Sequence, residues 1–482
     1  QTCALPISTA QTDIDALRYS QTSITGTARF SSMGGAFGAL GGDFSCLSYN
    51  PAGLAIFRKS EFTFSPSLYV GHTTSDFLGK SFSENRFNFN IPNIGLVVAK
   101  TMNEDKEGWK GWAFGLGMNR INNFQSISFF QGFNSQNSMV DYFVQQANIN
   151  GKESPDNLDS YSEWLAYQTG VIKADSDTTT GRWTYSKDQL PGQGITQQRN
   201  SVTRGGVSEI DISFGGNYNN LLYIGGSLGI STLRYLEETT FEETDKADII
   251  DTLNRYSFNQ DLATRGTGVN FKLGLILRPA DWIRIGGAFH TPTLYAMHDD
   301  YKVVMKSNLD GYGNFEQESP DWALDYTLTT PFKLVGSLGF IIGKIGLLGI
   351  DYEFVDYSSA RFDDNSISFS DVNTAVSSKY TTASNLRIGT EWRYRNLSFR
   401  AGYSMYGTPF GTGVNVAGAD QSKTSISGGI GIRDGNYFID LGYVNTQYTE
   451  YLQPYSLNYQ EVAVAKNKVQ TNNFVMTFGV KF

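Results

Sequence analysis

The feature that most constrains the fold is an alternation of apolar and polar residues that recurs through most of the chain. From about residue 60 to the C-terminus, fourteen stretches are long enough to cross a bilayer as strands, and each has an apolar residue at every second position. The last stretch alternates most strictly, with Phe474, Met476, Phe478, Val480 and Phe482 on one face. Such alternation is typical of membrane barrels, whose strands present side chains to lipid and lumen in turn.

The connections between these stretches separate a membrane barrel from a soluble sandwich, which also alternates. Short links, such as those at Asn219-Asn220 and Arg395-Asn396, alternate along the chain with long ones. The long links cover about residues 127–205, 240–257, 306–321, 361–380, 408–422 and 453–470. Tight turns at one end and long loops at the other are typical of an outer-membrane barrel with periplasmic turns. The sequence therefore predicts an all-β fold: residues 59–482 form a 14-stranded antiparallel transmembrane β-barrel, a multi-pass protein of the bacterial outer membrane.

Several stretches, such as 257–278 and 282–305, exceed the roughly 9–11 residues that a strand needs inside the bilayer. We expect the excess to form a raised extracellular rim, joined to the long extracellular loop at 127–205. Residues 161–167 of that loop form either a short helix over the mouth of the barrel or part of a disordered loop.

Composition excludes other classes of function. The formal net charge is −9 and no Lys or Arg cluster follows one face, so the chain lacks the electrostatic footprint of a nucleic-acid binder. With 3 His and 2 Cys, we expect no metal site and no cofactor. His290 and His298 share one predicted strand and one face, but at ~3.3 Å per residue they are about 26 Å apart and cannot share a metal.

The N-terminal region is predicted to have two parts. Residues 1–18 are a leader, of which 1–7 resemble a translated sequencing adapter, so this stretch and Cys3 are left out of the fold prediction. Residues 19–58 contain seven Gly with small residues between them. Because a barrel of fourteen strands is too wide to be filled by its own side chains, and glycine allows close backbone packing, we predict that 19–58 is a hatch inside the lumen.

A motif in this segment resembles a known family. A Gly-rich run over residues 31–43 is followed by an Asn-Pro-Ala-Gly-Leu element. The element consists of Asn50, Pro51, Ala52, Gly53 and Leu54. Together with the fourteen-strand rhythm, this resembles the N-terminal hatch of the long-chain fatty acid transporter family, in the glycine-rich form of its Bacteroidetes members.

The resemblance implies an outer-membrane channel for passive uptake of hydrophobic compounds such as long-chain fatty acids. In that family a ligand is caught under the extracellular loops, moves to a pocket in the lumen and leaves sideways through the wall when the hatch shifts. A fatty acid needs an apolar slot for its tail and a cation for its carboxylate, and Arg387, Arg393 and Arg400 are candidates for that cation. Glu391 lies on the same predicted face, so the alternative is an ion-pair lattice that braces the wall or anchors the hatch.

A lateral exit needs a break in the hydrogen-bond ladder of the wall, and proline cannot donate to a ladder. Pro92 falls inside an apparent strand and is one candidate for such a break. The family places its kink in the third strand, here about 111–126, where Asn119, Asn122 and Asn123 are polar interruptions. Three other prolines also fall inside apparent strands, and ordinary bulges at barrel rims explain such prolines equally well.

Three alternative functions remain open. A barrel of this family can serve as an interaction component of the type IX secretion machinery, because a fold does not fix function. An outer-membrane hydrolase needs a Ser-His pair, to which only His72 or His290 could contribute. A hemin receptor is the third, since some Bacteroidetes relatives carry that name. We expect a monomer that is not an enzyme, with hydrophobic small molecules such as fatty acids, outer-membrane lipid and lipopolysaccharide as partners.

Overall fold

The computed structural model describes residues 11–102, 107–149, 154–188, 193–248, 250, 252–411 and 421–482. Residues 1–10, with the adapter-like stretch and Cys3, lie outside this part of the chain. Within it, no helix is long and apolar enough to span a bilayer.

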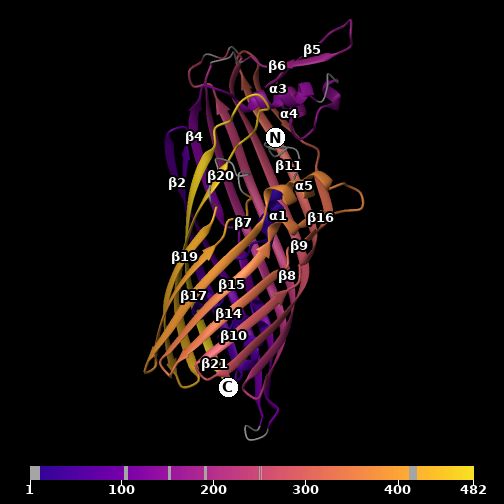
Figure 1. Ribbon diagram of the computed structural model, residues 1–482. Coiled ribbons are helices and arrows are strands. Elements are labelled where there is room, and N and C mark those ends of the chain that lie inside the picture. Colours follow the sequence, from indigo (N-terminus) through magenta and orange to yellow (C-terminus); the bar gives the residue numbers. More distant parts are fainter. Residues whose placement is uncertain are drawn as a thin grey trace.

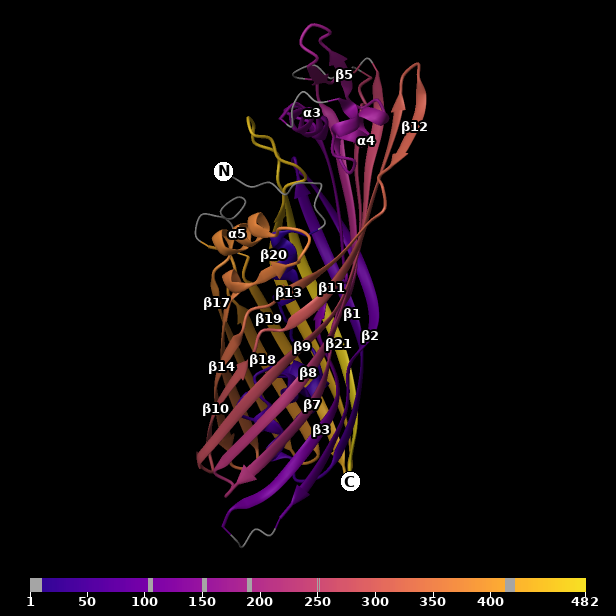
Figure 2. The same ribbon diagram turned by 90° about the vertical axis from the view of Figure 1, so that its right-hand side faces the viewer.

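The predicted fourteen-strand barrel is confirmed (Figures 1 and 2). Three of its strands are interrupted and carry two labels each: β3 with β4, β10 with β11, and β14 with β13. In chain order the wall is β1 (Glu61–Phe77), β2 (Lys80–Thr101), β3 (Trp109–Asn123) with β4 (Ser126–Asn134), β7 (Ile195–Tyr218), β8 (Leu222–Thr244), β9 (Leu253–Ala280), β10 (Ile283–His290) with β11 (Leu294–Leu309), β13 (Trp322–Thr329) with β14 (Lys333–Ile342), β15 (Gly346–Asp356), β17 (Thr382–Tyr394), β18 (Leu397–Tyr406), β19 (Lys423–Asp434), β20 (Tyr437–Leu452) and β21 (Ala465–Lys481). Neighbours pair antiparallel, and β1 pairs with β21 to close the cylinder.

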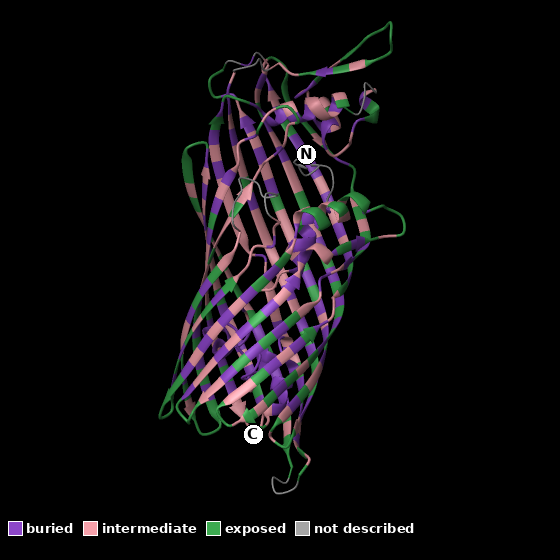
Figure 3. Ribbon diagram, in the orientation of Figure 1, coloured by how far each residue is buried: buried purple, intermediate pink, exposed green. Residues whose placement is uncertain are grey.

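The alternation in the sequence becomes an inside and an outside of this cylinder. Along the strands, exposed and buried residues follow one another, which Figure 3 shows as alternating green and purple. On β19 and β20, for example, Ile430 and Leu441 face outward and are exposed, whereas Asp440 faces inward and is fully buried. An apolar outer face suits lipid, and the pairing of β1 with β21 leaves no strand edge at the seam. The protein is a multi-pass outer-membrane barrel.

Turn chemistry explains which end of the barrel has the short connections. Asn219 and Asn220 between β7 and β8 have φ of 54° and 55°, and Arg395 between β17 and β18 has φ of 56°. Left-handed residues of this kind make the two-residue turns that suit the twist of paired strands. The C-terminus lies at this same end, shown at the bottom of Figure 1.

The opposite end is a tall rim, and here the predicted loop bounds were wrong. The loop predicted at 127–205 is shorter, because β4 and the first part of β7 extend into that range. The predicted loops at 240–257 and 306–321 are likewise largely strand, the second forming a hairpin of β11 with β12 (Gly313–Glu318). Above the bilayer the outer face of a strand contacts water instead of lipid, so the apolar outer residues that mark a membrane strand in the sequence are lost. The inner residues, such as Phe241 and Tyr256, stay buried against the loop helices.

The largest loop folds over part of the rim. It contains α3 (Met139–Ile149), η3 (Pro155–Asn157), α4 (Glu163–Gln168) and a hairpin of β5 (Lys173–Ser176) and β6 (Trp183–Ser186). Residues 161–167 thus include a short helix. The buried Glu243 of β8 accepts hydrogen bonds from the Met139 amide at 2.9 Å and from the side chains of Gln197 and Tyr256 at 2.7 Å each, and it also bonds Ser138. These contacts fix the start of α3 to three wall strands.

The N-terminal segment fills the bore. It consists of α1 (Asp13–Ser20), α2 (Ala28–Ser32), η1 (Phe44–Ser48) and η2 (Pro51–Ile56), and most of its residues are buried. We call residues 13–25 the upper hatch and residues 28–57 the lower hatch. The predicted boundary between leader and hatch at residue 19 falls inside α1, which buries Ala16, Leu17 and Tyr19 among aromatic residues of the wall. The sequence boundary was placed too late because α1 carries none of the glycines that marked the rest.

A smaller element group lies beside α1 at the rim. It consists of η4 (Tyr357–Ser359), β16 (Arg361–Asp363) and α5 (Ser370–Lys379). Asp13 at the start of α1 binds Lys379 at 3.0 Å and the Tyr380 hydroxyl at 2.9 Å. The upper hatch is therefore attached to the loop between β15 and β17.

Candidate functional site

A cavity lies between the upper hatch and the lower hatch. Its volume is about 100 Å³, and its lining includes residues 19–25 of the upper hatch and Phe30 and Tyr49 of the lower hatch. Gly35, Ser45 and Ser48 of the lower hatch also line it, and the rest of the lining comes from the wall, including Asn119, Arg120 and Ile121 of β3. Pockets for drug-sized ligands are about 300–1,000 Å³, so the cavity in this conformation is too small for a ligand of that size. A larger ligand needs the hatch to move.

The lining of this cavity is positively charged within a chain that is acidic overall. Its charged side chains are four cations, Arg120, Lys272, Lys333 and Arg387, and two carboxylates, Glu209 and Glu353. The lining thus carries an excess of two positive charges. These residues come from six wall strands, so only closure of the barrel brings them together.

The cations differ in how fully they are paired. Lys272 contacts Glu209 and lies 3.0 Å from Asp211, so its charge is matched by two buried carboxylates. Lys333 donates a 3.1 Å hydrogen bond to the hydroxyl of Thr22 in the upper hatch. Lys272, Glu209 and Asp211 were missed by the sequence reasoning, although Asp211 stands on the polar side of a clearly alternating stretch.

Of the three predicted carboxylate ligands, Arg387 lines the cavity. Its Nη2 donates to Glu353 at 3.1 Å, and its guanidinium carbon lies 4.4 Å from the centre of the Tyr49 ring. Its Nη1 and the hydroxyl of Tyr49 are buried, and neither has a hydrogen-bond partner in the described part of the chain. Buried polar groups are normally satisfied, so two unsatisfied donors at one cavity point to a missing partner.

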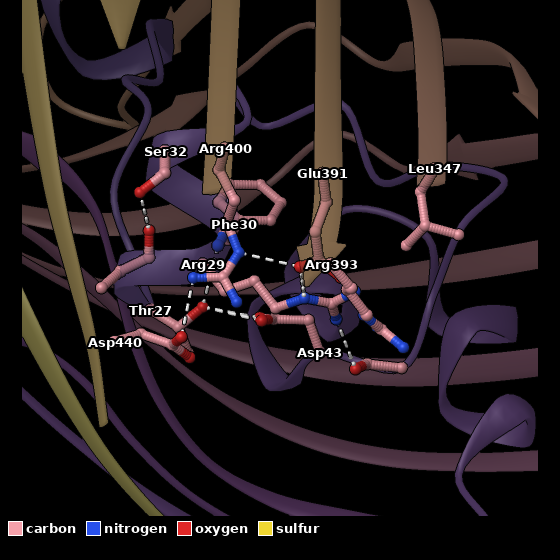
Figure 4. Close-up of polar contacts among 12 residues, drawn as sticks. Thr27, Arg29, Phe30, Ser32, Asp43, Leu347, Glu391, Arg393, Arg400 and Asp440 are labelled. Carbon is pink, nitrogen blue, oxygen red and sulfur yellow. Dashed lines mark hydrogen bonds and ion pairs between the residues drawn. The ribbon is translucent and has the colours of Figure 1, made fainter. Parts of the chain in front are cut away.

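Arg393 and Arg400, the other two predicted ligand residues, do not line this cavity and belong to a separate group of ion pairs (Figure 4). Glu391, which is fully buried, lies 2.7 Å from Arg393 and 2.8 Å from Arg400. Arg400 also lies 2.7 Å from Asp440 of β20. Arg29 of α2 completes the group at 2.7 Å from Glu391. These ion pairs form the lattice that the sequence offered as the alternative. The carboxylates of the wall pair with the two arginines, and Glu391 also binds the hatch through Arg29.

The Asn-Pro-Ala-Gly-Leu element forms the start of η2. The Asn50 side chain caps this helix by accepting from the Ala52 amide at 3.1 Å, and its amide group donates to the Gly38 carbonyl. Pro51 follows at the first helical position, where its fixed φ is suited to a helix start. Gly53 packs against Cys46, where a β-carbon would come within 2.6 Å of the sulfur. The element thus shapes the hatch and does not line the cavity.

The wall has a break beside this cavity. β2 pairs with β3 from Asn93, opposite Asn119, down to Thr101, opposite Gly111. Above Asn93, β2 keeps its partner β1, but the next strand has bent inward between β3 and β4, and β4 pairs with β7 alone among the described strands. On the unpartnered stretch of β2, Phe87 and Phe89 are 67% and 69% exposed. The hydrogen-bond ladder is therefore open over residues 80–92.

All four residues predicted at a lateral opening lie beside this same break. Pro92 lies in a bulge, since the pairing of β1 with β2 jumps from Ser65 opposite Asn93 to Ser67 opposite Asn90. Asn119 accepts from Asn93 at 2.8 Å and donates to Ser48 of the hatch at 2.7 Å. Asn122 donates to the carbonyl of Gln21 in the upper hatch at 2.9 Å, and Asn123 accepts from the Gln125 amide at 3.1 Å at the bend. The proline and the kink, which the sequence left as separate possibilities, lie at one place.

No family model and no curated protein matches the sequence. Among solved structures, a FadL homologue of Pseudomonas aeruginosa aligns over 96% of this chain and 99% of its own, with a TM-score of 0.56 and 13% identity. The toluene transporter TodX of Pseudomonas putida aligns over 95% and 99%, with a TM-score of 0.52 and 13% identity. The toluene transporter TbuX of Ralstonia pickettii aligns over 95% and 99%, with a TM-score of 0.51 and 16% identity. The chain has their fold.

The histidines are arranged differently from the prediction. β10 ends at His290 and β11 begins at Leu294, and the intervening Pro292 breaks the strand. The break shifts the alternation, so His290 is buried while His298 is on the outer side, and the expectation that they share a face was wrong. His290 contacts the Tyr49 carbonyl at 2.7 Å, and His72 contacts Asn85 at 2.9 Å. The described residues contain no group of three or more His, Cys, Asp and Glu that could hold a metal.

Proposed function

We propose that the protein is a passive outer-membrane channel for hydrophobic compounds that carry a carboxylate, such as long-chain fatty acids. The observation that carries the proposal is the position of a positively charged cavity beside an open stretch of the wall, above a plugged bore. The fold shared with a FadL homologue and with toluene transporters supports hydrophobic cargo. The charged lining favours an amphipathic acid over a pure hydrocarbon, because a hydrocarbon gives the unsatisfied donors no partner.

In this proposal Arg387 binds the carboxylate. A charge-assisted hydrogen bond from its Nη1 would satisfy a buried donor, and the Tyr49 hydroxyl would add a neutral donor. The apolar tail would lie toward β3 and leave through the open ladder between β2 and β4. Pro92, Asn119, Asn122 and Asn123 would shape that exit by keeping the two strands apart.

The upper hatch is the proposed gate. The Ser23 amide donates to the Ile121 carbonyl at 2.9 Å, and Asn122 donates to the Gln21 carbonyl at 2.9 Å. Both contacts join the upper hatch to β3, at the place where the hydrogen-bond ladder of the wall opens. Movement of residues 19–25 would enlarge the cavity and release the edge of β3 in a single step. Cargo enters from the tall rim, and the outward apolar belt contacts outer-membrane lipid and lipopolysaccharide. All of these parts belong to one chain, so the proposal needs only a monomer.

The test is uptake of labelled oleate, toluene and glucose by Gram-negative cells that lack their own fatty acid channel and express this chain. We expect oleate uptake to exceed that of cells with an empty vector, and glucose uptake to stay at the empty-vector level. Replacing Arg387 by Gln removes a hydrogen bond to a charged group, worth about 1.5–3 kcal/mol, so oleate binding should weaken roughly 10- to 150-fold.

Arg393→Gln is the matched control, because Arg393 lies on the same strand but outside the cavity lining. Equal losses of oleate uptake in both variants, with folded barrels, would rule out a ligand role for Arg387. Glucose uptake as fast as oleate uptake by the wild type would instead identify a general porin.

A further inference from the structure

The outer face of the wall changes from apolar to charged where the strands leave the bilayer. On β9, five successive outward residues from Val269 to Leu277 are apolar and 37% to 50% exposed. A transmembrane strand has about 9–11 residues inside the bilayer, so the membrane-spanning part of β9 is complete at Val269. Thr267 and Arg265 follow on the same face and are exposed. They therefore lie at the level of the lipid headgroups, at the end of the barrel opposite the short turns.

Four hydrogen-bond donors form a square at this level, on the adjacent strands β8 and β9 (Figure 2). Arg234 of β8 is directly opposite Arg265 of β9, and Thr232 is directly opposite Thr267 one row closer to the bilayer. All four residues are exposed on the outer face, and we call them the outer quartet. Directly opposite residues have their β-carbons about 4.5–5.5 Å apart. Two guanidinium groups and two hydroxyls are thus within reach of one small anion.

The positive charge of the outer quartet is only partly matched by the wall. Arg265 lies 2.6 Å from Asp300 of β11, and His298, its direct neighbour on β11, lies 2.6 Å from Asp325 of β13. Within the described ranges, the side chain of Arg234 has no hydrogen bond or ion pair. Like charges directly opposite on paired strands are destabilising. An anion bound between the two arginines would remove that repulsion and give Arg234 a partner.

We infer that the outer quartet binds a phosphate group of lipopolysaccharide, whose acyl chains lie on the apolar face below it. Guanidinium groups bind phosphate by paired, charge-assisted hydrogen bonds. In the row below the quartet, Ile230, Val269 and Leu294 are directly opposite one another, and Leu294 is 63% exposed. A phosphorylated lipid contacts both the charged and the apolar rows. A free phosphate ion contacts only the charged one, where salt screens exposed charges. The inference is independent of the cargo of the channel.

Two double variants with the same change of charge provide a matched test. The quartet variant carries Arg234→Gln and Arg265→Gln. The control variant carries Arg255→Gln and Lys306→Gln, which remove two cations from the rim, where the side chains are 61% and 54% exposed. Arg255 is on the same strand as Arg265 but about 33 Å farther from the bilayer, at ~3.3 Å per residue. Only the quartet variant should therefore lose affinity for the lipid.

The measurement is binding of fluorescently labelled lipopolysaccharide to the purified full-length proteins, freed of lipid in detergent micelles. Heat-modifiable mobility on gels checks that each barrel is folded. One arginine near an anionic lipid surface changes the affinity about fivefold, so the quartet variant should bind roughly 30-fold more weakly than the wild type. Arg234→Gln alone should bind about fivefold more weakly, and the control variant should bind like the wild type.

Competition identifies the group that is bound. Phosphorylated lipid A should displace the labelled lipid, whereas lipid A without its phosphates and millimolar inorganic phosphate should not. Equal affinities of the quartet and control variants would overturn the inference, as would displacement by the dephosphorylated lipid, because the apolar face alone would then account for binding. Displacement by inorganic phosphate would identify a site for the free ion and refute the assignment to a lipid. Oleate uptake should be the same in both variants, because the quartet lies outside the cavity lining.

Discussion

The contact of Arg29 with Glu391 predicts how firmly the hatch is attached to the wall. Replacing Arg29 by Gln removes the only hatch residue of the ion-pair lattice, but Glu391 keeps Arg393 at 2.7 Å and Arg400 at 2.8 Å. The carboxylate is thus not left unpaired, and the cost should lie below the roughly 3–5 kcal/mol of a fully broken buried pair. A charged hydrogen bond contributes about 1.5–3 kcal/mol. We expect opening of the hatch to become easier by that amount.

Cys46 reports this opening. It is fully buried in η1 of the lower hatch, and burial raises the pKa of its thiol to about 12. A charged maleimide can label it only after the hatch opens, so the labelling rate follows the opening equilibrium. In a Cys3→Ser background, Arg29→Gln should speed labelling roughly 10- to 150-fold, since every ~1.4 kcal/mol is a factor of ten.

Glu238→Gln is the control for this experiment. Glu238 also forms an ion pair, at 3.1 Å with Arg204, but both side chains are about half exposed at the rim. Exposed pairs contribute about 0–1 kcal/mol, and this one does not touch the hatch. If Arg29→Gln labels no faster than Glu238→Gln, the lattice does not hold the hatch, and the argument from burial and charge fails.

Three further predictions concern other parts of the molecule. Asn50→Ala removes the cap of η2 and the donor to the Gly38 carbonyl, so the unfolding free energy measured in urea should fall by at least about 1 kcal/mol, and Asn50→Asp, which keeps the capping oxygen but buries a carboxyl group against that carbonyl, should lose at least as much. Glu243→Ala leaves the amide of Met139 and the side chains of Ser138, Gln197 and Tyr256 without this acceptor, so trypsin should cut the loop over residues 154–188 faster than in the wild type, with no change in the barrel core. Wild-type Cys46 should stay unlabelled in the folded barrel as the pH rises from 7 to about 9, because its pKa lies well above that range and the protonated thiol is the unreactive form.

The wall was predictable because lipid imposes a rule on every second residue. Ile430 and Leu441 read as lipid-facing in the sequence because nothing but apolar contact is available there. The rule fades at the rim, which is why β4 and the upper part of β7 were taken for loop. The hatch was predicted from its glycines. Its start was placed too late because α1 has no glycine and is held by aromatic packing against the wall.

The site was harder to predict than the wall. Alternation shows that Arg387 and Arg400 both face the lumen, but it does not give the height or the angle around the barrel at which each one stands. Arg387 faces the cavity, whereas Arg400 lies among carboxylates below it, and this difference depends on registers between strands far apart in sequence. The cation of the hatch, Arg29, had no partner visible in the sequence, because Glu391 is hundreds of residues away.

The close packing of the lower hatch against the wall also bears on the order of assembly. At thirteen glycines on twelve of the fourteen wall strands, an added β-carbon would come within 3.0 Å of an atom of the lower hatch. A wall with so many glycines at one height cannot fill its own bore there, so the empty cylinder is a poor product by itself. The hatch is synthesised first and β21 last, yet the Ala28 amide donates to Thr477 of β21. The first and last parts of this chain to be made are thus in direct contact in the folded barrel, so the seat of the hatch is complete only when the whole wall has been synthesised.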